Sequence, residues 1–131
     1  MLVFLVRHAH AEPGDPDELR KLSERGRGEA KALGERLAGH ATPPALVLTS
    51  PLVRARETAT AIAAATGGEL RAEASLAPGA TADDVRGALE GLDGPVAVVG
   101  HQPDCSEIAV ELTGADPGFP TAGFFELTLD D

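Results

Sequence analysis

Three short apolar runs, each ending abruptly in polar residues, constrain the fold of this chain more than any other feature. They cover residues 2–6, 45–49 and 95–100. Each run is rich in Val, Leu or Ala and is apolar at consecutive positions rather than at alternate ones. This pattern is typical of strands buried on both faces, because helices cover both sides of a parallel sheet. We therefore expect three interior strands.

The segment after the first strand and its polar loop carries the signals of an amphipathic helix. Ser23 is a suitable N-cap, and we expect the helix to end around Gly39. Ala30, Leu33 and Leu37 are spaced three and four residues apart, so they share one face of that helix. Charged residues occupy the opposite face, which indicates a helix packed on one side only.

The rest of the chain continues the alternation of strands and helices. Ser50 followed by Pro51 predicts an N-cap and the first position of a second helix, which ends at Gly67. Weaker signals predict a strand over 69–74, a helix beginning at Thr81, a helix over 103–112 and a closing edge strand over 124–129. Each of these elements has a length that is usual for its type.

This order of elements predicts the fold class. Strands that alternate with helices form a mostly parallel sheet, since right-handed crossovers place helices on both faces. We find no repeat, linker or low-complexity segment. We therefore expect one α/β domain of three layers over residues 1–131, with its site beyond the carboxyl ends of the strands.

Charge and cysteine content exclude several functions. Twenty-one acidic against 11 basic residues leave a net charge of −10, which repels nucleic acids and anionic membrane surfaces. A phosphorylated substrate then requires a local cluster of cations. The single cysteine, Cys105, excludes an intrachain disulfide and fits a small buried side chain. No run approaches the roughly 20 apolar residues of a membrane span, so we expect a cytoplasmic protein that binds no membrane.

Polar side chains follow three of the predicted strands. Arg7 and His8 come directly after the first strand, Arg54 shortly after the second, and His101 directly after the fourth. The carboxyl ends of parallel strands lie along one edge of a sheet, so these four side chains can converge there. Two imidazoles and two guanidinium groups are suited to bind and transfer a phosphoryl group.

Four segments carry a family resemblance in the right order. They are residues 3–9, 22–26, 50–59 and 98–103, and together they extend over nearly the whole chain. They resemble the histidine phosphatase superfamily, and in particular its compact branch of bacterial phosphohistidine phosphatases. The resemblance implies a phosphoglycerate mutase-like fold and a phosphatase that needs no cofactor and no metal ion.

The resemblance also implies a role for each polar residue. His8 is the nucleophile that forms a covalent phosphohistidine, Arg7 and Arg54 bind the phosphoryl oxygens, and His101 completes the pocket. The chemistry agrees, because a neutral imidazole attacks phosphorus when an acceptor, which we expect to be a backbone carbonyl, holds its other nitrogen protonated. His10 is a further candidate for substrate binding at the rim, and an exposed loop histidine is the alternative interpretation.

Two positions depart from the family pattern. Ala9 stands where a glycine is usual, which matters only if the backbone there has a positive φ. Ser75 stands where many relatives carry an acidic proton donor, and Glu73 faces the other way in a strand. Phosphohistidine expels an imidazole without a strong acid, whereas an alkyl phosphate expels a poor leaving group.

We therefore predict hydrolysis of phosphohistidine or of a small phosphoramidate, with a phosphohistidine-bearing protein as one possible partner. Only about 40 residues separate Thr58 from Gly100, which leaves no room for a helical lid and favours a protein-borne phosphate. The alternatives are a broad phosphomonoesterase and a non-catalytic phosphate-binding module. A metal-dependent hydrolase built on His8, His10 and His101 lacks the paired carboxylates that would complete its ligand set.

Overall fold

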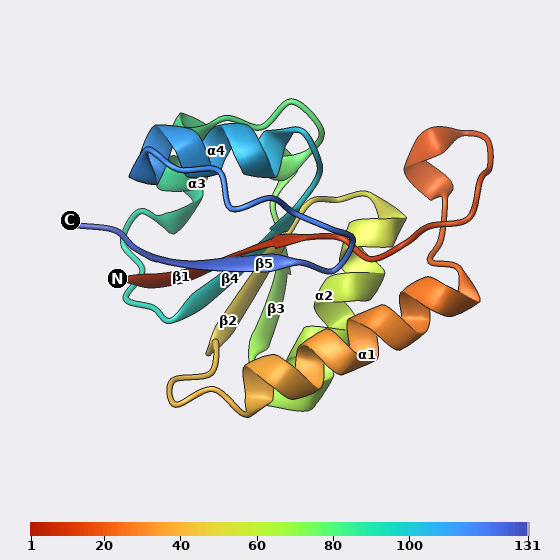
Figure 1. The fold of residues 1–131 in the computed structure, drawn as a ribbon, viewed down its shortest axis with the longest axis horizontal. Helices are drawn as coiled ribbons and strands as arrows, with labels where there is room; N and C mark the ends of the chain where they lie inside the picture. Colours follow the sequence, from red (N-terminus) through yellow and green to blue (C-terminus); the bar gives the residue numbers. More distant parts are fainter. Residues whose placement is uncertain (131) are drawn as a thin grey trace.

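A computed structural model describes residues 1–130 of the chain, in which a five-stranded sheet forms the middle layer (Figure 1). The strands are β1 (Leu2–Arg7), β2 (Leu46–Thr49), β3 (Glu69–Ala72), β4 (Val96–Gly100) and β5 (Phe124–Thr128). Their order across the sheet is β3-β2-β4-β1-β5, and only β5 is antiparallel to its neighbour. Asp131 lies outside the described residues, so the predicted domain bounds of 1–131 stay a prediction.

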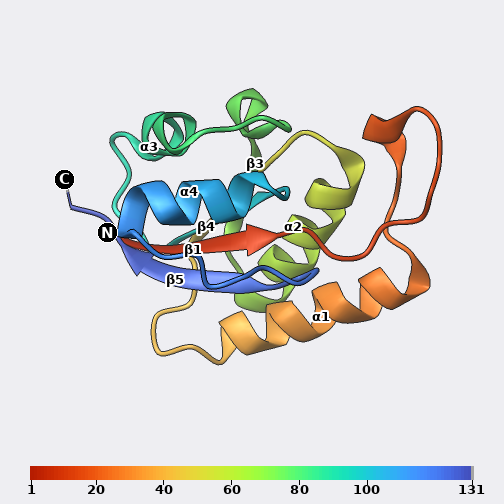
Figure 2. The same ribbon diagram turned by 45° about the horizontal axis from the view of Figure 1, so that its top comes forward.

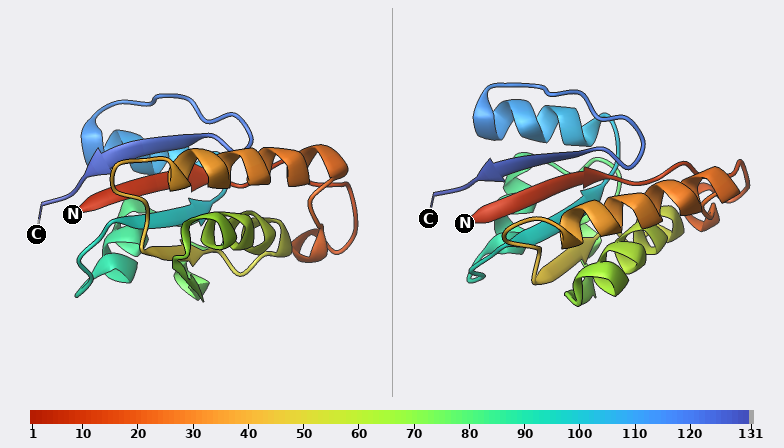
Figure 3. Two further views of the ribbon diagram at one scale, coloured as in Figure 1. Left: turned by 90° about the horizontal axis from the view of Figure 1, so that it is seen from below. Right: turned by 60° about the horizontal axis from the view of Figure 1, so that its bottom comes forward.

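Helices cover both faces of this sheet. They are α1 (Glu24–Ala38), α2 (Val53–Thr66), α3 (Ala82–Leu89) and α4 (Asp104–Thr113), with short 3₁₀ turns η1 (Asp17–Leu19) and η2 (Ala74–Leu76). The pair α1 and α2 packs on one face and the pair α3 and α4 on the other (Figures 1 and 3). The predicted three-layer α/β fold with a mostly parallel sheet is confirmed.

Successive residues of the interior strands face opposite layers, which explains why their sequences are apolar throughout. In β1, Val3 and Leu5 belong to the core under α3 and α4, whereas Phe4 and Val6 belong to the core under α1 and α2. All four side chains are at most 1% exposed. A strand covered on one face only would need polar residues at alternate positions.

The register of the parallel strands determines which residues lie at the carboxyl edge. Arg7 pairs with Gly100, and Val99 pairs with both Val6 and Thr49. The residues that follow these strands therefore emerge side by side. The loop 11–21, which carries η1, extends beyond the same edge, beside the N-terminal ends of α1 and α2 (Figure 2).

Most predicted element bounds agree with the structure to within one or two residues, and one cap was wrong. Helix α2 begins at Val53 after Leu52, so Ser50 is not its N-cap and Pro51 is not its first residue. The Ser50 side chain is fully buried and bonded to another part of the chain, as described below. The predicted Ser23 cap is confirmed, because its side chain accepts a hydrogen bond from Gly26 N.

Candidate active site

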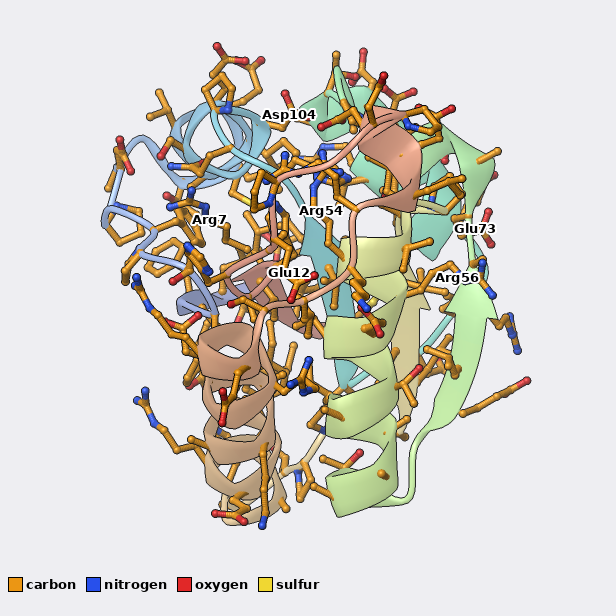
Figure 4. The ribbon with its side chains drawn as sticks, turned by 90° about the vertical axis from the view of Figure 1, so that its right-hand side faces the viewer. Arg7, Glu12, Arg54, Arg56, Glu73 and Asp104 are labelled. Atoms are coloured by element: carbon orange, nitrogen blue, oxygen red, sulfur yellow. The ribbon has the colours of Figure 1, made fainter. Side chains whose placement is uncertain are left out.

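The structure brings the residues that follow β1, β2 and β4 together at one edge of the sheet. His8 N donates to Gly100 O at 3.0 Å, and Ser50 N donates to Val99 O at 3.0 Å. The ring centroids of His8 and His101 lie 5.2 Å apart. Figure 4 looks onto this edge and shows Arg54 near its middle and Arg7 to the left of Arg54. The predicted convergence of two histidines and two arginines is thus found.

His8 is a neutral imidazole with one free nitrogen. Its Nδ1 lies 2.7 Å from Ala9 O. A carbonyl oxygen can only accept, so Nδ1 carries the proton and Nε2 keeps its lone pair. Burial lowers the pKa of His8 to about 4; the hydrogen bond to Ala9 opposes this shift, and the charges of Arg54 and Arg7 add to it. His8 therefore has the tautomer that a nucleophilic imidazole requires, with the expected carbonyl acceptor.

Ala9 is accommodated without strain in the loop after β1. Ala122 is the only non-glycine residue with positive φ in the described part of the chain, so Ala9 has an ordinary backbone conformation. Ala9 is fully buried, and its N donates to Thr58 Oγ1 at 3.0 Å. The same hydroxyl donates to Arg54 O at 2.8 Å. Thr58 thereby ties the loop of His8 to the helix that carries Arg54.

Arg54 binds Asp17, a residue that our sequence reasoning missed. Its side chain is only 8% exposed, and it donates from Nη1 to Asp17 O at 2.9 Å and from Nη2 to Asp17 Oδ2 at 3.1 Å. Arg20 Nη1 donates to the other carboxylate oxygen at 3.0 Å. Hydrogen bonds from Arg20 and then Arg54 lower the pKa of Asp17, so it is a carboxylate. No helix or strand pattern in loop 11–21 signalled this contact.

Arg7 is held by the segment between α4 and β5, whereas Arg54 is held by loop 11–21. Arg7 Nη1 donates to Phe119 O at 2.8 Å, in the segment between α4 and β5. Its Nε is buried and has no hydrogen-bond partner among the described residues. A buried guanidinium N–H without an acceptor is costly, which suits a site that an anion fills. The anchoring carbonyl of Phe119 could not be identified from the sequence.

His101 is also neutral. Burial lowers its pKa to about 4, and the charges of His8 and Arg54 act in the same direction. Its Nε2 lies 2.7 Å from Ser50 Oγ, and its Nδ1 is buried without a partner among the described residues. Ser50 is therefore a second residue whose place in the site the sequence analysis did not identify.

His10 lies in the same loop but is engaged by α1. Its Nδ1 lies 2.7 Å from Ser23 Oγ, and its N donates to Glu29 Oε1 at 2.9 Å. Both contacts fasten the loop to the first two turns of that helix. A role of His10 in substrate binding stays a prediction.

Residues 73–75, where we expected no proton donor, contain no carboxylate that is hydrogen-bonded to the four site residues. Ser75 is exposed in η2, and Glu73 follows β3. Figure 4 shows Glu73 on the β3 side near Arg56, apart from Arg7 and Arg54. Asp17 is the carboxylate that touches Arg54, and its lowered pKa makes it a poor acid at neutral pH.

Among residues 1–130, no three His, Cys, Asp or Glu side chains are grouped so that they could hold a metal ion. No helix over the same residues is long and apolar enough to cross a membrane.

A mostly parallel α/β sheet with two histidines and two arginines at its carboxyl edge fits a phosphatase, because guanidinium groups match the oxygens of a phosphoryl group. The chain belongs to the histidine phosphatase superfamily (branch 1), whose family model matches residues 3–78.

Comparison with known proteins supports this assignment. The solved structure of the protein histidine phosphatase SixA complexed with tungstate is 28% identical, with a TM-score of 0.89 over 99% of this chain and 89% of that chain. A chain from Agrobacterium tumefaciens named as a phosphohistidine phosphatase SixA is 29% identical, with a TM-score of 0.85 over 98% and 91% of the two chains. The fold is therefore the predicted phosphoglycerate mutase-like fold.

One curated relative carries a different name. The mitochondrial serine/threonine-protein phosphatase Pgam5 from Drosophila persimilis is 43% identical over 58 residues. The match covers 44% of this chain and 20% of that protein, so the chain matches about a fifth of the length of this relative.

Proposed function

We propose that the protein hydrolyses phosphohistidine through a covalent intermediate on His8. The observation that carries this proposal is the state of His8: its Nδ1 proton is held by Ala9 O at 2.7 Å, and its pKa is lowered to about 4. A neutral Nε2 beside two guanidinium groups is suited to attack phosphorus.

In the first step, the Nε2 lone pair of His8 attacks phosphorus and the bond from phosphorus to the leaving nitrogen breaks. The electron pair of that bond stays on the substrate nitrogen. If the substrate imidazole is protonated on its other nitrogen, it leaves as neutral imidazole. His8 becomes a phosphorylated imidazolium, which Ala9 O stabilises through the Nδ1–H hydrogen bond.

In the second step, water attacks phosphorus and the bond from phosphorus to His8 Nε2 breaks. The electron pair returns to Nε2, so His8 is again neutral, and the proton lost by water leaves with phosphate or solvent. Arg7 and Arg54 hold the equatorial oxygens in both steps, and their fixed forks match those oxygens better than a lysine would. We propose that these two cations supply the charge stabilisation and that no metal ion takes part.

The substrate preference follows from the carboxylates around the site. Asp17 is ionised by its arginine partners, and Ser75, at the position where the family resemblance places a proton donor, is not a carboxylic acid. An alkoxide leaving group therefore lacks an acid, whereas imidazole needs none. The similarity to the SixA structures supports the same preference. We further propose a phosphohistidine-bearing signalling protein in the cytoplasm as the partner.

Trapping the intermediate tests the mechanism. A reaction quenched in alkali should leave a phosphoryl group on His8 that is stable in alkali and labile in acid, and His8→Ala should lack it. His10→Ala provides the matched control, because it removes a neighbouring imidazole and leaves His8 in place. A phosphate located on any residue other than His8 would contradict the mechanism.

A comparison of leaving groups separates this proposal from a broad phosphomonoesterase. We expect kcat/KM for phosphohistidine to exceed that for a sugar phosphate by at least about 100-fold, the contribution of a general acid. p-Nitrophenyl phosphate should fall between them, because its leaving group is good. Equal turnover of all three would favour the phosphomonoesterase, and no turnover of any would favour a non-catalytic binding module.

A further inference from the structure

Ser50 occupies a position in the site that none of its local signals explains. Its side chain is fully buried rather than capping α2, and its Oγ lies 2.7 Å from Nε2 of His101, 51 residues along the chain. Serine hydroxyls both donate and accept, so this contact alone leaves two arrangements of the proton. The neighbouring hydrogen bonds distinguish between them.

The backbone supplies one donor to this hydroxyl. Leu52 N donates to Ser50 Oγ at 3.3 Å. If His101 Nε2 also donated, the hydroxyl would accept two hydrogen bonds, and its own proton would have no acceptor among the described residues at a fully buried position. If the hydroxyl instead donates to Nε2, every group at this contact is satisfied. Buried polar groups overwhelmingly adopt the satisfied arrangement.

This arrangement determines the other nitrogen of the ring. His101 is neutral at pH 7, since burial lowers its pKa to about 4, so an Nε2 that accepts leaves the proton on Nδ1. Nδ1 is buried and has no partner among the described residues, and the ring lies beside that of His8. A buried N–H without an acceptor is rare, and a phosphoryl oxygen held next to His8 supplies one.

We propose that Ser50 is a positioning residue that sets the tautomer of His101, so that its Nδ1–H donates to a phosphoryl oxygen of the substrate. In the opposite tautomer the Nδ1 lone pair would face that oxygen and repel it. The proposal rests on the function proposed above, because it names what His101 offers to the phosphoryl group. It gives Ser50, the first residue of the third motif segment, a chemical role.

The tautomer can be measured directly by ¹⁵N NMR of histidine-labelled protein, with His101→Gln to assign the resonances. We expect Nδ1 of His101 to resonate as a protonated nitrogen and Nε2 as an unprotonated one. His8 has its Nδ1 proton held by a carbonyl and provides an internal reference. A protonated Nε2 on His101 in the wild-type protein would overturn the proposal, whatever the enzyme proves to hydrolyse.

Ligand binding tests the second half of the proposal. Adding orthovanadate, which resembles the transferred phosphoryl group, should shift the Nδ1–H resonance of His101 strongly. The ring nitrogens of His40, whose Nδ1 accepts from Thr42 N, should shift little. In Ser50→Ala, the His101 nitrogens should move toward the averaged shifts of mixed tautomers. An Nδ1–H resonance that vanadate leaves unchanged would contradict donation to the phosphoryl group.

Kinetics provide a separate readout. Ser50→Ala should lower kcat/KM at least about tenfold, as expected for a weakened hydrogen bond to the transition state. Thr60→Ala is the matched control, because it removes an exposed hydroxyl of α2 that bonds only to Arg56 O. Loss of activity in Ser50→Ala with an unchanged His101 tautomer would show a structural role and refute the proposal. If His101 has the expected tautomer but no phosphoryl adduct forms on His8, the result would count against the proposed function and not against the role of Ser50.

Discussion

At the scale of single residues, the site combines polar groups that have hydrogen-bond partners with polar groups that have none among the described residues. Ala9 O holds the proton of His8, and Asp17 holds two nitrogens of Arg54. Arg7 Nε and His101 Nδ1 have no partner among the described residues. The carboxylate of Asp17 thus binds Arg54, which we propose also binds the phosphoryl group. We therefore expect the Asp17 carboxylate and the phosphoryl group to compete for Arg54.

Removing the charge of Asp17 tests this competition. Asp17→Asn should strengthen inhibition by inorganic phosphate, because Arg54 loses a competing anion and the pocket loses a negative charge. We expect the inhibition constant to fall by about three- to tenfold at low salt, and by less at high salt. Glu18→Gln in the same 3₁₀ turn is the control, since Glu18 has no side-chain bond to Arg54. An equal change in both variants would indicate only a general charge effect.

At the scale of elements, the loop after β1, which carries His8, depends on the close approach of α1. A Cβ built on Gly26 would lie 1.8 Å from His10 O, closer than any real contact. Ser23 N also donates to His10 O at 3.0 Å, so the first turn of α1 presses on the backbone two residues after His8. This contact explains why the segment 22–26 belongs with the site although it supplies no catalytic group.

Two glycines of α1 offer a matched test of that contact. Gly26→Ala should lower the free energy of unfolding by at least about 2 kcal/mol, because backbone on both sides must move. A Cβ added at Gly28 has no neighbouring atom within 4 Å. Gly28→Ala should therefore raise the free energy of unfolding by roughly 0.5–1 kcal/mol, because alanine has the higher helix propensity. Urea unfolding monitored by circular dichroism measures both. Similar stabilities for the two variants would contradict the close approach.

At the scale of the whole molecule, a chain with net charge −10 places cations and neutral imidazoles in one buried site. The pKa values of His8 and His101 are both about 4 in the folded protein, compared with 6.5 for the model group. The unfolded chain therefore binds protons on both residues at a pH where the folded chain does not. Acid favours the unfolded state through this difference.

This difference predicts a specific pH window. Above about pH 6.5 both imidazoles are neutral in the folded and in the unfolded state, so proton binding does not lower the free energy of unfolding. As the pH falls below about 6.5, proton binding to the unfolded chain lowers the free energy of unfolding by at most about 2.7 kcal/mol per pH unit for two protons. This loss of stability is complete below about pH 4. Urea unfolding at several pH values measures the slope, which the double variant His8→Asn/His101→Asn should reduce. An equal slope in that variant would assign the effect to other groups.

The sequence by itself determined the elements and the position of most site residues along them. Runs such as 2–6 predicted interior strands because consecutive apolar residues can be buried only when both faces are covered. The Ser23 cap was correct because a cap bonds within its own turn. His8, Arg7, Arg54 and His101 were placed together because parallel strands align their carboxyl ends.

The tertiary structure alone decided which partners these residues have. Ser50 had every local mark of a helix cap, yet its hydroxyl bonds His101, 51 residues away. Asp17 reaches Arg54 over 37 residues, and Arg7 reaches Phe119 O over 112. Local propensities differ by about 1 kcal/mol, whereas a buried polar group without a partner costs about 1–3 kcal/mol. Long-range hydrogen bonding in the packed site therefore prevails over local preference.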